Sequence, residues 1–520
     1  MSDPFYITTA INYPNGPPHV GHAYEAITTD VIARYQRLRG RDVFFMTGTD
    51  EHGLKMAQAA RERGVEPQAL ADEMSSLFRQ MDEALNISFD RFIRTTEAEH
   101  HHASQSLWER MSAAGDIYLG RYEGWYSVRD EAYYDEEELA VADTGEKFSP
   151  QGTPVEWTVE ESWFFRLSAY QERLLGHYAA NPDFIRPEAR RNEVLRFVEG
   201  GLSDLSISRT SFDWGVKVPG SDDHVMYVWL DALTNYITGV GYPHEEAETY
   251  RKYWPADLHI IGKDVVRFHA VYWPAFLMSA GVPLPRQVFG HGHVLLRGEK
   301  MSKSAGNVVS PQAMVEAFGV DAVRYSLVRD VTFGQDGSYS PEAIVTRVNA
   351  DLANSFGNLA QRTLSFIAKN CGGELPSGGK GDPADAALLE LVRTALVDEM
   401  ASQFDALGLS QACEAWLRAV FACNQYIDVQ APWTLRKTDP ERMVAVLATL
   451  VEALRMLALA IQPVIPVGAN RLLDQLGVRE ADRWWAALAD ADAYDRMLAA
   501  GGQLAPPQPI FPRLEASAGG

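Results

Sequence analysis

Residues 5–53 read "FYITTAINYPNGPPHVGHAYEAITTDVIARYQRLRGRDVFFMTGTDEHG", and this stretch decides the fold class. The apolar run at 5–11 combines β-branched and aromatic residues without interruption, which is typical of a buried strand. From Val20 to Leu38, apolar residues recur at steps of three or four, which predicts an amphipathic helix. A second apolar strand, ending in a polar loop with glycine, is expected in 42–53. Strand, helix and strand in this order form a right-handed βαβ unit with parallel strands, so we expect an α/β fold.

The same succession returns later in the chain and indicates how the domains are organised. A strand followed by a helix is expected in 224–237 and again in 258–277. Before these segments, residues 116–225 alternate aromatic and polar residues around turns, which predicts a strand-rich insertion. From about 345 to 480, helical periodicity dominates. We therefore predict a Rossmann-like parallel-sheet domain that is split by a mixed α+β insertion and followed by an all-α bundle.

Size and charge set limits on the class of protein. The chain has 520 residues, more than the ~250–300 that one hydrophobic core normally serves, so several domains are expected. The net charge of −23 does not exclude a nucleic-acid partner, because phosphate binding depends on local basic patches. The start of the chain lacks the pattern of a secretory signal, and no stretch reaches the ~18 uncharged apolar residues of a membrane span. We therefore expect a cytoplasmic protein with no membrane partner.

Two histidines, His19 and His22, stand where the first helix is predicted to begin, directly after a pair of prolines. Three interpretations are open at this point. The pair could ligate a metal, although a third ligand would be needed. The stretch could be structural, because proline is favoured where a helix begins. The helix N-terminus could also bind a phosphate through its N–H groups and dipole, with Gly21 permitting close approach and the imidazoles adding donors.

A lysine-containing loop is predicted at 298–307, which read "GEKMSKSAGN". It places Lys300 and Lys303 between flanking glycines. Two mobile ammonium groups suit a reacting triphosphate, because such transfers depend mostly on positioning and on stabilising charge. A loop of this kind is usually solvated surface, but its combination with the histidine pair on one α/β framework favours a phosphate site.

Both motifs resemble the paired signatures of the class I aminoacyl-tRNA synthetases. The stretch "KMSKS" (300–304) matches the family motif completely, and "HVGH" (19–22) differs only by Val20 in place of Ile or Leu. Further stretches are similar to the methionyl-tRNA synthetase family in particular, and the match runs over roughly residues 5–480. They are "GTDEHG" (48–53), "YVWLDAL" (227–233), "HIIGKDVVRFH" (259–269), "GNLAQR" (357–362) and "APW" (431–433).

The resemblance implies a two-step reaction. L-methionine would be activated by ATP, bound as its Mg²⁺ complex, to methionyl-adenylate with release of pyrophosphate. The methionyl group would then pass to the 3′-terminal adenosine at the acceptor end of tRNA(Met). Catalysis and phosphate binding are assigned to His19, His22, Lys300 and Lys303, and the ATP site is completed by Gly21, Gly262 and Asp264.

The resemblance also assigns the residues that recognise the amino acid and the tRNA. Asp50 would pair with the α-ammonium group of methionine. The other methionine-binding positions are Ile11, Tyr13, Trp229, Ala232, Leu233, Tyr236, Val265 and His269. Aromatic walls suit a polarizable thioether, because sulfur–aromatic contacts add ~0.3–1.5 kcal/mol. The CAU anticodon would be read by Asn358, Arg362 and Trp433.

The insertion departs from that of many relatives, which hold a zinc knuckle with cysteines. The three cysteines, Cys371, Cys413 and Cys423, all lie outside it, so we expect no structural zinc and no other metal site. No dimerising extension follows residue 480, so we expect a monomer. The boundaries implied are 1–115 and 226–295 for the two halves of the Rossmann-like domain, 116–225 for the connective insertion, 296–345 for the KMSKS loop and stem-contact region, 346–480 for the anticodon-binding helices and 481–520 for a C-terminal tail. The last residues, 501–520, contain many Pro and Gly residues and are expected to be extended or partly disordered.

Two other functions are compatible with parts of the sequence. A nucleotidylyltransferase that adenylylates a small acid would share the His-x-Gly-His motif, but it would not need the helical region at 345–480. A catalytically inactive RNA-binding relative would keep that region, but it would not need intact histidines and lysines in both motifs.

Overall fold

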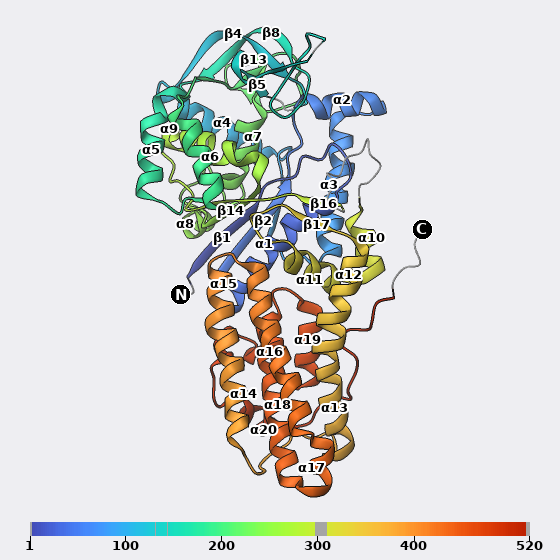
Figure 1. Ribbon diagram of the computed structural model, residues 1–520. Coiled ribbons are helices and arrows are strands. Elements are labelled where there is room, and N and C mark those ends of the chain that lie inside the picture. The colour runs from blue at the N-terminus through green and yellow to red at the C-terminus, as the bar shows by residue number, and fades with distance from the viewer. Residues whose placement is uncertain (1–2, 130–131, 143, 297–308, 516–520) are drawn as a thin grey trace.

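The computed structural model describes residues 3–129, 132–142, 144–296 and 309–515. The loop that contains Lys300 and Lys303 lies outside the described residues. Figure 1 shows an elongated molecule, with the strands gathered at one end and a bundle of long helices at the other. The predicted fold class, an α/β domain followed by an all-α domain, is confirmed.

A six-stranded parallel sheet forms the centre of the α/β part, in the order β3-β2-β1-β14-β15-β9. Ile7 of β1 aligns with Phe45 of β2 on one side and with Leu258 of β14 on the other. The predicted βαβ unit is present, and its crossover helix α1 (Val20–Leu38) has the bounds expected from the sequence. The strands are β1 (Pro4–Thr9), β2 (Asp42–Thr49), β3 (Arg91–Arg94), β9 (Ile185–Arg186), β14 (Leu258–Gly262) and β15 (Val288–His291).

The order of these strands creates a topological switch point between β1 and β14. Strands β2 and β3 extend the sheet on one side of β1, and β14 and β15 extend it on the other. In open α/β sheets, ligands bind outside the carboxyl ends of the strands at such a point. The helices around the sheet are α2 (Leu54–Arg63), α3 (Pro67–Ala84), α4 (Ala98–Ala113), α7 (Val228–Thr238), α8 (Glu248–Tyr253), α9 (Trp273–Ala280), α10 (Pro311–Phe318) and α11 (Val320–Asp330).

The strand-rich insertion lies at the far end of the α/β part (Figure 1). Its larger sheet, in the order β10-β8-β4-β5, is antiparallel and contains β4 (Ile117–Ser127), β5 (Ala132–Tyr134), β8 (Glu156–Phe165) and β10 (Leu205–Ser206). A second antiparallel sheet contains β11 (Ser208–Arg209), β12 (Lys217–Val218) and β13 (Ser221–Met226). Two small pairs are β6 (Ala140–Val141) with β7 (Lys147–Phe148), and β16 (Val294–Leu296) with β17 (Gly337–Tyr339).

The structure differs from the sequence-based organisation at two strands. Strand β9 falls inside the predicted insertion, yet Ile185 pairs with Val288 at the edge of the central sheet, flanked by α5 (Gln171–Ala180) and α6 (Glu188–Glu199). Conversely, β13 was expected to return the chain to the α/β domain, but it pairs only within an antiparallel sheet. Short strands acquire their hydrogen bonds from distant partners, so their local pattern does not identify the sheet they join.

The knuckle of the insertion is held together without cysteines. The carboxylate of Glu136 accepts a hydrogen bond from the indole N–H of Trp125 (2.7 Å) and pairs with Lys147. The Lys147 ammonium also lies 4.1 Å from the centre of the Trp125 ring. Beside them, the hydroxyls of Ser127 and Thr153 are 2.7 Å apart and buried. Among the described residues, no three histidine, cysteine or acidic side chains come close enough together to hold a metal ion.

Long helices form the second part of the molecule, as predicted. The helix α12 (Pro341–Arg347) continues through a π-helical segment, Val348–Gly357, into α13 (Asn358–Asn370). A second π-helical segment, Thr394–Met400, joins α14 (Pro383–Arg393) to α15 (Ala401–Asp405). The remaining helices are α16 (Leu409–Gln430), α17 (Pro432–Thr438), α18 (Pro440–Ile461), α19 (Pro466–Gln475) and α20 (Ala493–Ala499).

Helix α18 is long and apolar enough to cross a membrane, with a mean hydropathy of 2.1 over its most apolar window. However, 78% of that window is buried inside the protein. The helix lies along the middle of the bundle in Figure 1, and this position accounts for its apolar composition.

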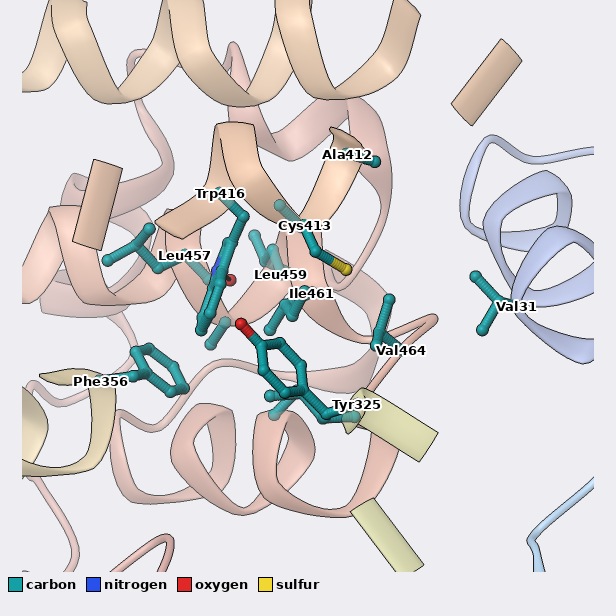
Figure 2. Close-up of a cluster of buried hydrophobic side chains, with 14 of the residues drawn as sticks. Val31, Tyr325, Phe356, Ala412, Cys413, Trp416, Leu457, Leu459, Ile461 and Val464 are labelled. Carbon is teal, nitrogen blue, oxygen red and sulfur yellow. Dashed lines mark hydrogen bonds between the residues drawn. The ribbon is translucent and has the colours of Figure 1, made fainter. Parts of the chain in front are cut away.

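The bundle and the α/β part share one hydrophobic core. Figure 2 shows Tyr325 of α11 directed toward Trp416 of α16, with Phe356 beside them and Val31 of α1 at the edge of the same cluster. The indole N–H of Trp416 donates a hydrogen bond to the carbonyl of Leu457, 3.0 Å away. The two parts therefore pack as a continuous body at this junction.

A buried ion pair reinforces the junction. The carboxylate of Asp30 on α1 lies 2.7 Å from the guanidinium of Arg324 on α11, and neither side chain is exposed. The same guanidinium donates to the backbone carbonyls of Pro463 and Val464, at 2.9 and 3.0 Å. Helix α1 is thus tied to the bundle through a charged group whose donors are satisfied in the interior.

The described residues of the C-terminal tail pack against the rest of the protein, and the last of them are extended, as the sequence predicts. The extended part is pinned to the bundle by paired hydrogen bonds, since the Asn349 side chain bonds both the N–H and the carbonyl of Leu514 (2.8 and 2.9 Å). Residues 485–499 are largely helical, and Trp485 is buried with its ring 5.1 Å from that of Tyr35. The aromatic neighbours of Trp485 are Tyr35 on α1 and Phe404 on α15, which are remote in sequence, so local composition gives no sign of them.

Asp82 on α3 offers a test of how burial affects stability. Its carboxyl group is buried, and neither oxygen has a hydrogen-bond partner in the part of the chain that the structure describes. Burial raises the pKa of Asp82 well above its ordinary value, and the charges of Asp30 and Glu83 add to this effect. The folded protein therefore holds this proton more tightly than the unfolded chain does. The protonated Asp82 carboxyl group favours folding fully at a pH below the pKa that it has in the unfolded chain. This stabilisation is lost as the pH rises through the higher pKa that the group has in the folded protein.

We expect the Asp82→Asn variant to be more stable than the original at neutral pH, with Tm raised by about 1–3 °C. The neutral amide removes the cost of either protonating or burying a carboxylate, so the gain should shrink toward a pH of about 4. Thermal unfolding at both pH values measures it. Glu73→Gln, at an exposed position of the same helix, is the control and should change Tm little. A gain that grew in acid would contradict this explanation.

Candidate active site

The two histidines of the first motif cap helix α1 and each other. The backbone N–H of Gly21 donates to Nδ1 of His19, the N-cap residue, and the backbone N–H of His19 donates to Nδ1 of His22, both at 3.1 Å. The two rings stack with their centroids 3.8 Å apart. Because Nδ1 accepts in each ring, the neutral imidazole carries its proton on Nε2. Capping and phosphate binding therefore use different nitrogens of the same rings and are compatible.

The preceding prolines, Pro17 and Pro18, lie outside the helix, which begins at Val20. They therefore do not occupy the first helical turn and remove no N–H donor from it, although the N–H of Gly21 is used by the His19 cap. A Cβ on Gly21 would lie 2.9 Å from the His19 ring, so the close approach expected of this glycine is to the capping histidine.

A cavity of about 500 Å³ opens at the switch point of the sheet. Its walls come from the segments that follow β1, β2 and β14 and from helix α7. The structure brings together there all the predicted ATP- and methionine-site residues that it describes. These are Ile11, Tyr13, His19, Gly21, His22, Asp50, Trp229, Ala232, Leu233, Tyr236, Gly262, Asp264, Val265 and His269. Lys300 and Lys303 belong to the segment that the structure does not describe.

One end of the cavity is aromatic. The rings of Trp229 and Phe268 stack with centroids 3.8 Å apart and planes within 5°. Behind them, Nδ1 of His269 donates to the carbonyl of Val265 (2.9 Å), so Nε2 accepts from the hydroxyl of Tyr236 (2.6 Å). Burial lowers the pKa of His269 to about 4, so the ring is neutral at physiological pH. This end of the cavity suits an uncharged, polarizable side chain.

Asp50 supplies an acidic group to the wall of the cavity. It follows β2 directly, its backbone N–H donates to the carbonyl of Asn12 (2.8 Å), and it is 7% exposed. A nearly buried carboxylate in the wall of a cavity is placed to pair with a cationic group of a ligand.

An imidazole–carboxylate pair also lines the cavity near the histidine motif. It was not among the site residues predicted from the sequence. Nε2 of His291 lies 2.7 Å from the carboxylate of Glu25, and Nδ1 lies 2.8 Å from the carbonyl of Gly292. Both partners accept, so both nitrogens donate and the ring is an imidazolium. Burial would lower the pKa of His291, but the hydrogen bond and charge of Glu25 outweigh this effect and raise it. The stretch "GHGH" (290–293), directly after the apolar Val288 and Phe289, was the available signal.

The three candidate anticodon residues lie far from this cavity, on the helical bundle. Asn358 and Arg362 are one turn apart on α13. Trp433 is the second residue of α17, which lies at the tip of the bundle farthest from the sheet (Figure 1). The guanidinium of Arg362 lies 5.2 Å from the centre of the Trp433 ring and 2.6 Å from the carboxylate of Asp428. Trp433 is 42% exposed, so its ring presents a stacking surface to solvent.

A parallel sheet with a switch-point cavity, a His-x-Gly-His helix start and a helical domain behind it define a class I aminoacyl-tRNA synthetase. A family model described as "tRNA synthetases class I (M)" matches residues 5–364, and one described as "Anticodon binding domain of methionyl tRNA ligase" matches residues 375–518. The chain belongs to the methionyl-tRNA synthetase family.

Individual relatives support this assignment over the whole length of the chain. The methionine--tRNA ligase of Mycobacterium bovis is 58% identical over 516 residues, which are 98% of both chains. That of Brucella suis is 58% identical over 509 residues, with the same coverage. The structure of Mycobacterium tuberculosis methionyl-tRNA synthetase in complex with methionyl-adenylate, 58% identical, superposes with a TM-score of 0.94 and covers 98% of this chain and 100% of its own. The apo form from that organism gives 0.87, at 54% identity and 99% coverage of both chains.

Proposed function

We propose that the protein is a methionine–tRNA ligase, which activates L-methionine with ATP and transfers it to the 3′-terminal adenosine of tRNA(Met). The observation that carries the proposal is the cavity at the switch point, because it combines a phosphate-binding helix start, a buried carboxylate and an aromatic end. The match to a structure solved with methionyl-adenylate supports the same reaction. The enzyme is proposed to act in the cytoplasm as a monomer.

In the first step, the ATP phosphates would lie at the start of α1, with Gly262 and Asp264 on the nucleotide. The Nε2–H groups of His19 and His22 would donate to the phosphate oxygens as negative charge shifts onto the leaving pyrophosphate. Lys300 and Lys303 would stabilise the same pyrophosphate, and ATP would arrive as its Mg²⁺ complex. The methionine carboxylate attacks the α-phosphorus, the bond to the β-phosphate bridging oxygen breaks, and methionyl-adenylate remains bound.

Methionine itself would be held at both of its ends. Asp50 would pair with the α-ammonium group, and this contact orients the carboxylate toward the nucleotide. The thioether would lie among Trp229, Leu233 and Tyr236, with Tyr13, Ile11, Ala232, Val265 and His269 completing the wall. The neutral state of His269 matters here, because a charged ring would disfavour an apolar side chain.

In the second step, a hydroxyl of the terminal adenosine attacks the adenylate carbonyl and AMP leaves. The helical domain would select the tRNA by reading the CAU anticodon with Asn358, Arg362 and Trp433. Unstacked anticodon bases can stack on an exposed indole and accept hydrogen bonds from a guanidinium, which matches the arrangement at the tip of the bundle. An enzyme that adenylylates a free small acid would have no use for this domain.

The decisive test is amino-acid-dependent exchange of labelled pyrophosphate into ATP. We expect exchange with methionine. At equal concentration, the rate of exchange with leucine, or with an analogue of the size of norvaline, should be at least about a hundredfold lower, because these side chains lack the thioether contacts. Charging of tRNA(Met), followed by acid precipitation, tests the second step. Absence of methionine-dependent exchange would refute the proposal.

Replacing Trp433 with alanine should separate the two steps. We expect charging of tRNA(Met) to fall by about 10- to 100-fold, because loss of one base–aromatic stack costs ~1–3 kcal/mol. Methionine-dependent pyrophosphate exchange should stay within a factor of two, since Trp433 lies on the far tip of the bundle. Trp484, which is also exposed, provides a matched control as Trp484→Ala. An equal loss in both assays would mean that Trp433 is structural.

A further inference from the structure

A buried carboxylate on α7 connects the two ends of the methionine site. Oδ2 of Asp231 lies 2.7 Å from Nδ1 of His52, and Oδ1 lies 2.7 Å from Nε2 of His100. The Asp231 and His100 side chains are fully buried, and that of His52 is 2% exposed. None of the three lines the cavity. The proposed reaction therefore gives these buried titratable groups no direct role.

The positions of these residues in the sequence show which two parts of the methionine site the Asp231 carboxylate connects. Helix α7 carries Trp229, Ala232, Leu233 and Tyr236 on the face that lines the cavity, and Asp231 lies on a different face of the same helix. His52 lies two residues after Asp50, in the loop that leaves β2. The bond from His52 to Asp231 thus links the loop of the ammonium-binding carboxylate to the helix of the thioether pocket.

The charges of this cluster favour a fixed geometry. Burial alone would raise the pKa of Asp231, but the charges and hydrogen bonds of His52 and His100 outweigh it and hold the pKa well below its ordinary value. Asp231 is therefore ionised and accepts from both imidazoles, which become donors at Nδ1 of His52 and Nε2 of His100. Two charge-assisted bonds in a dry interior are short, directional and costly to break.

Other bonds hold the loop but do not connect it to α7. The indole N–H of Trp214 donates to the carbonyl of Glu51 (2.7 Å), and the N–H of Glu51 donates to the hydroxyl of Thr95 (2.8 Å). The Glu51 carboxylate in turn binds the guanidinium of Arg94 (2.7 Å). These bonds tie the loop to β3 and to the insertion. The bond from His52 to Asp231, in contrast, joins the loop to the pocket helix.

We propose that Asp231 is a positioning residue, which sets the distance between Asp50 and the thioether pocket through His52. This inference rests on the proposed function, since it assumes that methionine spans the two. Only a few bonds separate the ammonium nitrogen of methionine from its sulfur, so the distance between them is limited. Both contacts can therefore form together only if the loop and the helix stay within a narrow range of relative positions. His100 holds Asp231 from the other side and does not touch the loop.

The test measures how much the ammonium group contributes to binding. We expect L-methioninol and its deamino analogue to compete with methionine in the pyrophosphate-exchange assay. The two compounds share the thioether and differ only in the ammonium group, so the ratio of their inhibition constants reports the ammonium contact. We expect Asp231→Asn to reduce this ratio by about tenfold or more, which is the usual range for a group supporting a ligand-binding residue. The inhibition constant of the deamino analogue should change by less than about threefold.

Two further variants separate positioning from general destabilisation. His52→Asn removes the loop side of the His52–Asp231 bond and should reduce the ratio of inhibition constants as Asp231→Asn does. His100→Asn leaves this bond in place, so most of the ratio should be retained. Asp385→Asn breaks an ion pair with Arg442 on the bundle, 2.6 Å in length, and serves as the matched control. It should lower Tm without changing the ratio.

The outcomes distinguish this inference from the proposed function. Methionine-dependent exchange by the original protein, with an unchanged ratio in Asp231→Asn and His52→Asn, would overturn the inference and leave the function standing. A ratio that fell equally in His100→Asn and Asp385→Asn would also overturn it, because the effect would then follow lost stability. No methionine-dependent exchange by the original protein would remove both.

Discussion

The Asp50→Asn variant is expected to lose about two to three orders of magnitude in kcat/KM for methionine in the pyrophosphate-exchange assay. Asp50 is nearly buried in the cavity wall and would pair with the α-ammonium group. Removing one partner of a buried charge pair costs ~3–5 kcal/mol, because the other charge then enters the site without compensation. Asparagine keeps the size of the side chain, so the loss reports the charge. The KM for ATP should stay within about threefold.

A control for the Asp50 variant comes from the same network of charges. Asp72 pairs with the guanidinium of Arg94 at 2.6 Å, and Arg94 also binds Glu51 in the loop after β2, but the Asp72 side chain is 53% exposed. Asp72→Asn should therefore change kcat/KM by less than about threefold, as expected for a surface ion pair. If both variants lost activity equally, the loop geometry and not the Asp50 charge would determine methionine binding.

The second large effect is expected at His19, where the capping of helix α1 can be separated from the proposed donation to the ATP phosphates. The His19→Asn variant keeps a side-chain acceptor at the N-cap position, because asparagine is among the best N-cap residues. It lacks the Nε2–H donor that we propose for the ATP phosphates. Loss of one preorganised donor commonly reduces kcat by ~10²–10³, so we expect a drop of that size in exchange with little change in Tm.

The His19→Ala variant completes this comparison. It loses both the donor and the cap, so it should match His19→Asn in activity and be less stable by about 1 kcal/mol. Urea unfolding at neutral pH measures the difference in stability. If His19→Asn kept full activity and only His19→Ala lost it, the histidine would be a helix cap and not a phosphate donor. Dependence of the original activity on a transition metal would instead support the metal interpretation.

Much of the fold could be predicted because its signals are local. The segment from Val20 to Leu38 forms a helix with the expected bounds, since its apolar period is set within the segment itself. The residues after β1, β2 and β14 meet in one cavity because parallel strands bring their carboxyl ends to one edge of a sheet. Motifs distant in sequence could thus be assigned to a common site without knowledge of their distances.

Other features could not be predicted because their partners are remote in sequence. Strand β9 is two residues long and is defined by its pairing with β15, about 100 residues later. Trp485 is ordered by Tyr35, and the charge on His291 depends on Glu25 in α1. In each case the residue type is compatible with several environments. The environment that it has is determined by a partner from a distant part of the chain.

The sequence by itself determined the succession of elements, the residue types at the start of α1 and around the cavity, and the resemblance that joined them. Periodicity and spacing are properties of a local stretch of the chain, so they can be recognised in the sequence without a structure. The tertiary structure decided which nitrogen of His19 and of His22 carries the proton, which carboxyl groups are ionised, and that Asp231 links the loop of Asp50 to the pocket helix. Proton positions and ionisation depend on burial and on the facing partner, and these exist only once distant segments are packed together.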